Sequence, residues 1–284
     1  MKTILLPTDF SANAMNAGKY ALDLFRDERV NFILLHAYKI KDYYENSVLV
    51  AKPTRSVLEK ERNRIEGDFK AVLRELRAYA GEAHFFHTAS HNLLITDAIL
   101  RELRKNRIDF IVIGNQGHTG ENKAIYGSNT INIIEEIQKC PILSVPSTIN
   151  FVKPTEIVLA NSFKAELKPA DLNFLIFLVQ KFNAALRILH ISEEGGLNRE
   201  QKNNRTLLKE KLSAVTHSFH SLEYLRVPLG IYSFIESRES GMIAFINKKH
   251  SFLENLLMNP LYKNLAHYSK IPVLVLHQPP EPKQ

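Results

Sequence analysis

The first half of the chain alternates short apolar runs with longer segments in which apolar residues recur at helical spacing. The apolar runs predict strands, and the amphipathic segments predict helices. One helix is indicated by Ala14, Ala17, Ala21 and Leu24, and Ser11 is a suitable N-cap for it. The predicted strands cover residues 2–6, 32–37, 84–88, 109–113 and 141–146. Strands that alternate with helices are typical of a parallel, doubly wound sheet.

The longest amphipathic segment places Ile65, Phe69, Val72 and Leu76 on one helical face, and Gly81 is a suitable end for that helix. Residues 39–53, which precede it, are expected to be irregular. Further helices are predicted over residues 94–103 and behind residues 128–130.

The same pattern restarts after residues 146–154, which are predicted to be a linker. Residues 157–163 repeat 4–10, 186–191 repeat 32–37, 241–246 repeat 109–114, and 271–276 repeat 140–145. Repeats of this length are whole domains rather than solenoid units. We therefore expect an α/β protein of two tandem domains, residues 1–148 and 149–284, each a five-stranded parallel sheet with helices on both faces in a Rossmann-like, doubly wound arrangement.

Glycines follow the fourth predicted strand. Gly114, Gly117 and Gly127 precede a Ser-Asn-Thr sequence and the apolar pattern of the next helix. A glycine loop exposes backbone N–H groups and a helix N-terminus adds partial positive charge, so the two together bind anions such as phosphate. Ser128 and Thr130 add hydroxyl donors. The spacing matches neither the P-loop nor the dinucleotide fingerprint, and a turn-rich loop with a helix cap is an equally good interpretation at this point.

Three segments of the first half resemble the universal stress protein family. The spacing Gly114-x2-Gly117-x9-Gly127-Ser128 resembles the nucleotide-binding signature of that family. Residues 4–11, ILLPTDFS, resemble its first strand and acidic loop, and residues 33–37, ILLHA, resemble its second strand. The resemblance implies an adenine nucleotide alpha hydrolase-like fold and a regulatory role in the stress response. It covers the first half well and the second half in outline.

The resemblance also implies where an adenine nucleotide is bound. Asp9 would accept a hydrogen bond from a ribose hydroxyl or the adenine amine, and a turn or capping role is the alternative. The backbone of Ala37 would meet the adenine edge. The other implied contacts are Pro7 and Ile113 at the base, Thr8 beside Asp9, and Gly114, Gly117, Gly127, Ser128, Asn129 and Thr130 at the phosphates. The expected ligand is ATP, with ADP and AMP as alternatives, and Mg²⁺ would be held mainly by its phosphates.

The second half departs from this signature. Ile246, Lys249 and Met258 fall opposite the three loop glycines, and Ser162 falls opposite Asp9. Bulky side chains prevent the close backbone approach that a phosphate needs. We therefore expect one nucleotide site per chain, in the N-terminal domain.

Histidines and the cysteine have simpler interpretations. His118 lies within the glycine loop, where solvent exposure is favoured over contact with a γ-phosphate. His36 and His190 occupy matching positions in the two halves, which indicates a structural role. His84 and His87 would point to opposite faces of a strand, so no zinc site is expected. Cys140 is expected to be a small buried apolar group.

Composition limits the remaining functions. The 284 residues carry a net charge of +7 without a long basic run, so nucleic-acid binding is not expected. The absence of a membrane-length apolar run and the single cysteine favour a cytoplasmic protein. No hydrolase motif or metal-ligand spacing is present, so at most slow ATP hydrolysis is expected.

Two alternatives remain for the function. One is a protein-interaction scaffold of the same fold whose glycine loop is a relic. The other is a nucleotide hydrolase or an adenylate-transferring enzyme. By resemblance, the last strands, residues 142–145 and 273–276, would pair within the chain, and two chains would form a homodimer.

Overall fold

The computed structural model describes residues 1–40, 55–116, 126–247 and 271–277. The first half contains β1 (Lys2–Pro7), α1 (Ala12–Leu24), β2 (Val30–Ala37), α2 (Arg55–Tyr79), β3 (His84–His91), α3 (Ile95–Lys105), β4 (Phe110–Gly114), α4 (Ser128–Glu136) and β5 (Ile142–Val145). The second half contains β6 (Glu156–Ala160), α5 (Pro169–Phe182), β7 (Ala185–Ser192), α6 (Arg199–Lys211), β8 (His217–Glu223), α7 (Val227–Arg238), β9 (Met242–Asn247) and β10 (Val273–His277). The predicted alternation is confirmed. Most of the expected irregular segment, residues 39–53, lies outside the described residues.

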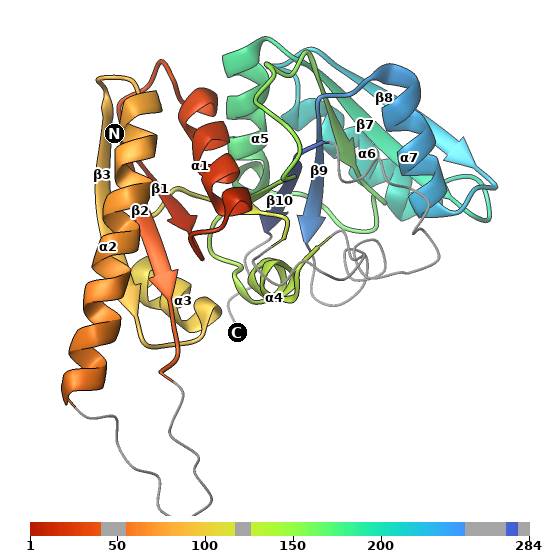
Figure 1. Ribbon diagram of the computed structural model, residues 1–284. Coiled ribbons are helices and arrows are strands. Elements are labelled where there is room, and N and C mark those ends of the chain that lie inside the picture. Colours follow the sequence, from red (N-terminus) through yellow and green to blue (C-terminus); the bar gives the residue numbers. More distant parts are fainter. Residues whose placement is uncertain (41–54, 117–125, 248–270, 278–284) are drawn as a thin grey trace, which may run out of the picture.

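All ten described strands form one sheet, in the order β3-β2-β1-β4-β5-β10-β9-β6-β7-β8 (Figure 1). Each half therefore repeats the doubly wound order in which the third, second, first, fourth and fifth strands lie side by side. The neighbouring strands are parallel except at the centre, where β5 and β10 are antiparallel, with Leu143 opposite Leu274. This contact confirms the predicted pairing of the last strands. It buries one edge of each half and leaves β3 and β8 at the ends of the sheet.

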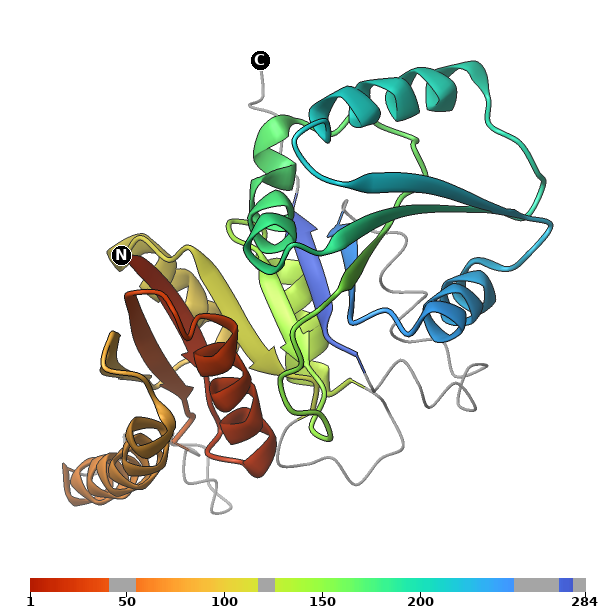
Figure 2. The ribbon, with the colours of Figure 1, turned by 90° about the horizontal axis from the view of Figure 1, so that it is seen from above.

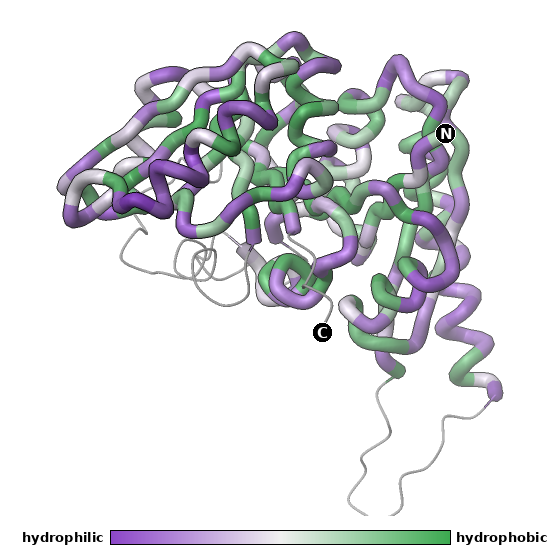
Figure 3. Tube along the Cα trace, turned by 180° about the vertical axis from the view of Figure 1, so that it is seen from behind, coloured by the Kyte–Doolittle hydropathy of each residue, from purple (hydrophilic) through white to green (hydrophobic). Residues whose placement is uncertain are grey.

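Helices cover both faces of the sheet, as the doubly wound fold requires. One face packs against α1, α2, α5 and α6, and the other packs against α3, α4 and α7. Seen from above, strands at the two ends of the sheet point in very different directions, as strand twist predicts (Figure 2). Hydrophobic residues follow the central strands and hydrophilic ones the outer helices (Figure 3). The long helix α2 buries Ile65, Phe69 and Leu76, which confirms its predicted apolar face.

The structure confirms the predicted N-cap of α1. The Ser11 hydroxyl accepts a hydrogen bond from the Ala14 backbone N–H at 3.2 Å, so Ser11 is the N-cap. Capping of this kind stabilises a helix by about 1 kcal/mol. The cap also fixes the direction in which the chain leaves β1, which matters for the site described below.

Aromatic side chains join the two halves on the face covered by α1 and α5. Phe174 of α5 lies 4.1 Å from Phe110 of β4, measured between ring centroids, and Phe177 stacks on Phe25 at 6.4 Å. At the edge of this contact, the Glu28 carboxylate lies 2.8 Å from the Lys181 ammonium. The halves are thus held together by side-chain packing as well as by strand pairing.

Cys140 is 5% exposed, which confirms the expectation of a buried apolar group. Burial, with a smaller contribution from the charge of Asp109, raises the pKa of its thiol to about 12. The thiolate is the reactive form, and a pKa about three units above the ordinary value lowers its fraction roughly a thousandfold. We predict that a disulfide reagent modifies Cys140 slowly in the native protein and rapidly in guanidinium. Rapid modification of the native protein at neutral pH would contradict this.

Candidate functional site

The turn after β1 is held by side chains that bond to its own backbone. The Thr8 hydroxyl accepts from the Phe10 N–H at 3.0 Å, and Asp9 Oδ1 accepts from the Ser11 N–H at 3.1 Å. Phe10 has a positive φ of 64°, which these bonds stabilise. Asp9 therefore has the turn role that its position suggested.

His36 and His190 support equivalent turns in the two halves. Nδ1 of His36 donates to the Thr8 carbonyl at 2.8 Å, and its ring lies 4.4 Å from that of Phe10. Nδ1 of His190 donates to the Asn161 carbonyl at 3.1 Å, and its ring lies 5.2 Å from that of Phe163. The predicted structural role of both histidines is confirmed.

The N-terminus of α4 is anchored to the end of β4. The Gly127 N–H donates to the Asn115 carbonyl at 2.8 Å, and the Thr130 hydroxyl donates to the Gly114 carbonyl at 3.0 Å. Because Leu5 lies opposite Ile111, β4 is the neighbour of β1, where the strand order reverses. In open α/β sheets, ligands bind at this point.

Thr130 differs from the sequence expectation. Its side chain is 5% exposed and its hydroxyl already donates to Gly114, so it positions α4 rather than offering a hydroxyl to a ligand. Ser128 and Asn129, in contrast, are exposed in the first turn of α4. Gly127 has no side chain with which to cap this helix end. The first-turn N–H groups and the Ser128 hydroxyl are therefore the anion donors that this end offers.

The remaining predicted site residues lie near the same edge of the sheet. Pro7 and Ala37 end β1 and β2, which are adjacent, and Pro7 lies opposite Leu35 in their register. Both are half-buried, as are Thr8 and Asp9, whereas Ile113 is buried in the sheet. Gly117 and His118 lie outside the described residues.

Asn13 is a member of this site that the sequence analysis missed. Its side chain is 9% exposed and its amide donates to the Gln116 carbonyl. A Cβ atom at Gly114 would lie 2.6 Å from Asn13 Nδ2, so the glycine is needed for this contact. One turn later, Asn16 donates to the carbonyls of Pro146 and Ile149 at 3.0 and 2.9 Å. The sequence feature that could have identified these contacts is the pair of asparagines, three residues apart, in an alanine-rich helix.

The histidines of β3 are also explained by local partners. His84 is buried and its Nε2 donates to the Phe25 carbonyl at 3.1 Å, whereas His87 is exposed. His91 Nε2 lies 2.7 Å from the carboxylate of Glu102, a buried residue that the sequence analysis did not single out. Among the described residues, no group of histidine, cysteine and carboxylate side chains is arranged to hold a metal ion.

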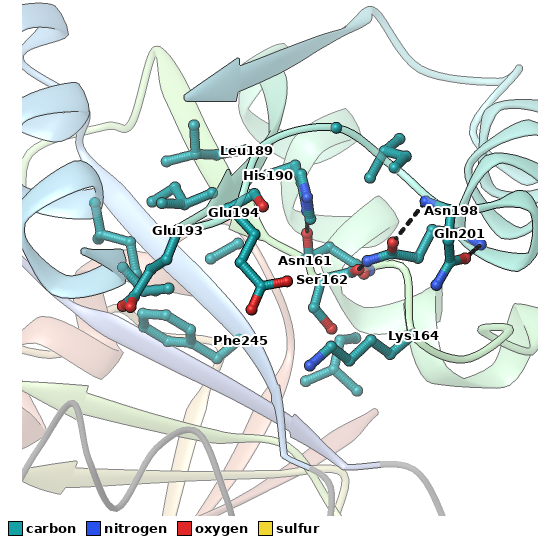
Figure 4. Close-up of a pocket in the computed structure, with 18 of the residues that line it drawn as sticks. Asn161, Ser162, Lys164, Leu189, His190, Glu193, Glu194, Asn198, Gln201 and Phe245 are labelled. Carbon is teal, nitrogen blue, oxygen red and sulfur yellow. Dashed lines mark hydrogen bonds between the residues drawn. The ribbon is translucent and has the colours of Figure 1, made fainter. Parts of the chain in front are cut away.

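The second half contains a cavity of about 820 Å³ at the carboxyl ends of β6, β7 and β9 (Figure 4). Val158 lies opposite Ile243, just as Leu5 lies opposite Ile111, so Ile246 takes the place of Gly114. The cavity thus occupies the position in the second half that corresponds to the carboxyl ends of β1 and β4 in the first half.

Comparison with known proteins assigns the chain to a family. The sequence model of the universal stress protein family matches residues 1–146. The chain belongs to the universal stress protein family. No curated protein matches the chain significantly. Within the described parts of this family member, no helix combines the length and apolar character needed to cross a bilayer.

Solved structures of universal stress proteins share the whole two-part fold. A universal stress protein from Archaeoglobus fulgidus DSM 4304 superposes with a TM-score of 0.68 at 15% identity, over 97% of this chain and 96% of that chain. A protein assigned to the universal stress proteins of Pseudomonas aeruginosa UCBPP-PA14 gives 0.58 at 13% identity, over 98% and 93%.

The same fold also occurs outside stress proteins. The cytoplasmic domain of a prokaryotic cation chloride cotransporter superposes with a TM-score of 0.54 at 10% identity, over 97% of this chain and 95% of that chain. At these identities the likeness shows the fold alone, so function has to be argued from the site.

Proposed function

We propose that the first half binds ATP, or a related adenine nucleotide, in the crevice between β1 and β4. One observation carries the proposal. The N-terminus of α4 is fixed against the end of β4 by the bonds of Gly127 and Thr130, while Ser128 and Asn129 in its first turn are exposed and no side chain caps the helix. Such a helix end, at the point where the strand order reverses, favours a phosphate.

The roles of the other residues follow from their chemistry. Asp9 would accept a hydrogen bond from the adenosine, with Pro7, Thr8, Ala37 and Ile113 around the base. Gly114, Gly117, Gly127, Ser128 and Asn129 would contact the phosphates, with His118 near the γ-phosphate. Mg²⁺ would be held mainly through the phosphates. The bound nucleotide would make the chain a regulatory module of the stress response in the cytoplasm, and two chains would form a homodimer.

The experiment is to denature freshly purified protein and identify any released nucleotide by mass. Titration of nucleotide-free protein with ATP, and with GTP as the matched control, measures affinity and base preference. About one adenine nucleotide per chain, with ATP preferred to GTP, is expected. No released nucleotide and no ATP binding at millimolar concentration would exclude the proposal and favour the scaffold. Turnover well above one ATP per minute would favour an enzyme.

Substitution of Gly114 by alanine tests the start of the glycine loop. The added Cβ would displace the Asn13 amide from the Gln116 carbonyl, because no space separates them. We expect the free energy of unfolding to fall by about 1–2 kcal/mol and ATP affinity to fall roughly tenfold.

A double-mutant cycle with Asn13→Ala isolates this contact. In the double variant the Cβ no longer meets the amide, so we expect it to be no less stable than Asn13→Ala alone. Strictly additive losses, measured by urea unfolding, would show that Gly114 is needed for another reason.

A further inference from the structure

The cavity of the second half has polar side chains at its rim and apolar side chains along its walls. Ile191, Val227 and Ile246 line it as half-buried side chains, with the buried Leu189 and Phe245 beneath them. The His190 ring is locked by its bond to the Asn161 carbonyl. At about 820 Å³ the cavity has the size of sites that enclose small molecules.

The charged groups at the rim are not balanced. Glu193 and Glu194 line the cavity from the loop after β7, and Lys164 lines it from the loop after β6. In Figure 4 the side chains of Glu194 and Lys164 come from different loops, and their charged ends point into the same space. Among the lining residues that the structure describes, two carboxylates stand against one ammonium, and this negative balance favours a cationic group on the ligand.

The loop that carries the two carboxylates has a defined shape. Gly195 and Gly196 follow them with positive φ values of 80° and 68°, a conformation that favours glycine. The Gly195 N–H donates to the Ser192 hydroxyl at 3.0 Å, and a Cβ at Gly195 would lie 2.8 Å from the Tyr224 ring. The two exposed carboxylates therefore directly precede a turn with a defined backbone conformation.

Features that would favour a phosphate are missing from the described walls of this cavity. Ile246 stands where the first half has Gly114, so a side chain blocks the close approach of that backbone. At the N-terminus of α6, the Gln201 N–H donates to Asn198 Oδ1 at 2.9 Å and the Asn198 N–H donates to Gln201 Oε1 at 3.0 Å. This capping box satisfies donors that an anion would otherwise use.

We propose that the cavity of the second half is a separate site for an aromatic or heteroaromatic amine that lacks a phosphate. The apolar walls enclose the ring, the amide Nδ2 of Asn161 offers a hydrogen bond near it, and Glu193 and Glu194 attract the protonated amine. The proposal does not depend on nucleotide binding by the first half. It assigns the duplicated fold two sites with different ligand chemistry.

Calorimetric titration of the full chain with tryptamine at pH 7 tests this site, with indole-3-propionate as the matched anionic probe. Tryptamine is expected to bind about tenfold more tightly than the acid, because the two carboxylates attract its ammonium group and repel the carboxylate of the acid. Glu193→Gln with Glu194→Gln is expected to weaken tryptamine binding roughly fivefold, and Lys164→Gln to strengthen it.

Ser162→Trp provides the blocked control. Ser162 is exposed at the rim, and its backbone carbonyl can keep the bond from Gln201, so the variant is expected to fold with an unchanged melting temperature and to lose tryptamine binding. Saturating ATP should leave tryptamine binding unchanged. Equal affinity for the two probes, no binding of either, or binding that survives Ser162→Trp would overturn the proposal. Competition by ATP would also overturn it, because it would make the cavity a nucleotide site.

Discussion

Gly127→Asp is expected to weaken ATP binding by the first half about 100-fold or more. Gly127 is the N-cap of α4 with a φ of −72° and a ψ of 152°, a conformation that any residue adopts. Aspartate is a better N-cap than glycine, so the variant should fold with unchanged or slightly higher stability. Its carboxylate would stand beside the phosphates. Two like charges about 4 Å apart repel by roughly 4 kcal/mol at an effective dielectric constant of about 20.

Gly127→Asn distinguishes the effect of the added charge from that of the added volume, because asparagine has the same shape as aspartate and also caps helices. We expect it to weaken ATP binding only severalfold. Adenosine, which has no phosphate, should bind both variants as it binds the wild type. Titration calorimetry measures all three affinities. If Gly127→Asp binds ATP as tightly as the wild type, the phosphates do not lie at the N-terminus of α4.

Glu156→Gln is expected to lower the free energy of unfolding at pH 7 by about 3 kcal/mol. Glu156 lies at the start of β6, its side chain is 10% exposed, and its carboxylate accepts hydrogen bonds from Arg187 and Arg238 at 2.7 Å and from Ser240 at 2.9 Å. Glutamine keeps the shape but leaves two half-buried guanidinium groups without their counter-charge. Urea unfolding measures the loss.

The effect of Glu156→Gln should depend on pH in a defined direction. Burial by itself raises the pKa of Glu156, but the hydrogen bonds from Arg238, Arg187 and Ser240 outweigh it and lower the pKa to about 2 from the ordinary 4.5. A lowered folded-state pKa stabilises the protein fully above about pH 4.5, and this stabilisation is lost as the pH falls toward 2. The stability difference between wild type and variant should therefore shrink over that interval.

Glu166→Gln is the matched control. Glu166 also pairs with a basic residue, Lys211, at 2.5 Å, but its side chain is 56% exposed. Exposed pairs contribute less than about 1 kcal/mol, so the same chemical change should have a small effect there. A loss at Glu166 as large as that at Glu156 would show that burial is not the cause.

Local sequence was sufficient for the secondary structure and for much of the topology. Apolar runs and helical spacing reflect the burial of each residue in its own element, and the strand and helix bounds agree with them to within a few residues. The repeat predicted two copies of one fold, and the matched positions of His36 and His190 predicted their structural role. The pairing of β5 with β10 was expected from the resemblance to universal stress proteins, and it covers one edge of each half.

The tertiary structure alone decided which polar side chains act together. Asn13 reaches Gln116 across 103 positions of sequence, and Arg238 reaches Glu156 across 82. Such contacts leave no periodic signal, because hydrogen bonds depend on the meeting of distant strands and helices rather than on neighbours in sequence. Nothing in the sequence indicated that the Thr130 hydroxyl donates to the Gly114 carbonyl, and its prediction as a phosphate ligand was therefore wrong.

The cavity of the second half is the clearest case of this difference. The sequence showed that Ile246 replaces a glycine, and from this it predicted the loss of the nucleotide site. It did not predict the cavity, whose described lining comes from strands, loops and helices between Ala160 and Asn247. A substitution in one strand reveals what a site no longer binds, whereas the volume that remains depends on how all the surrounding elements pack.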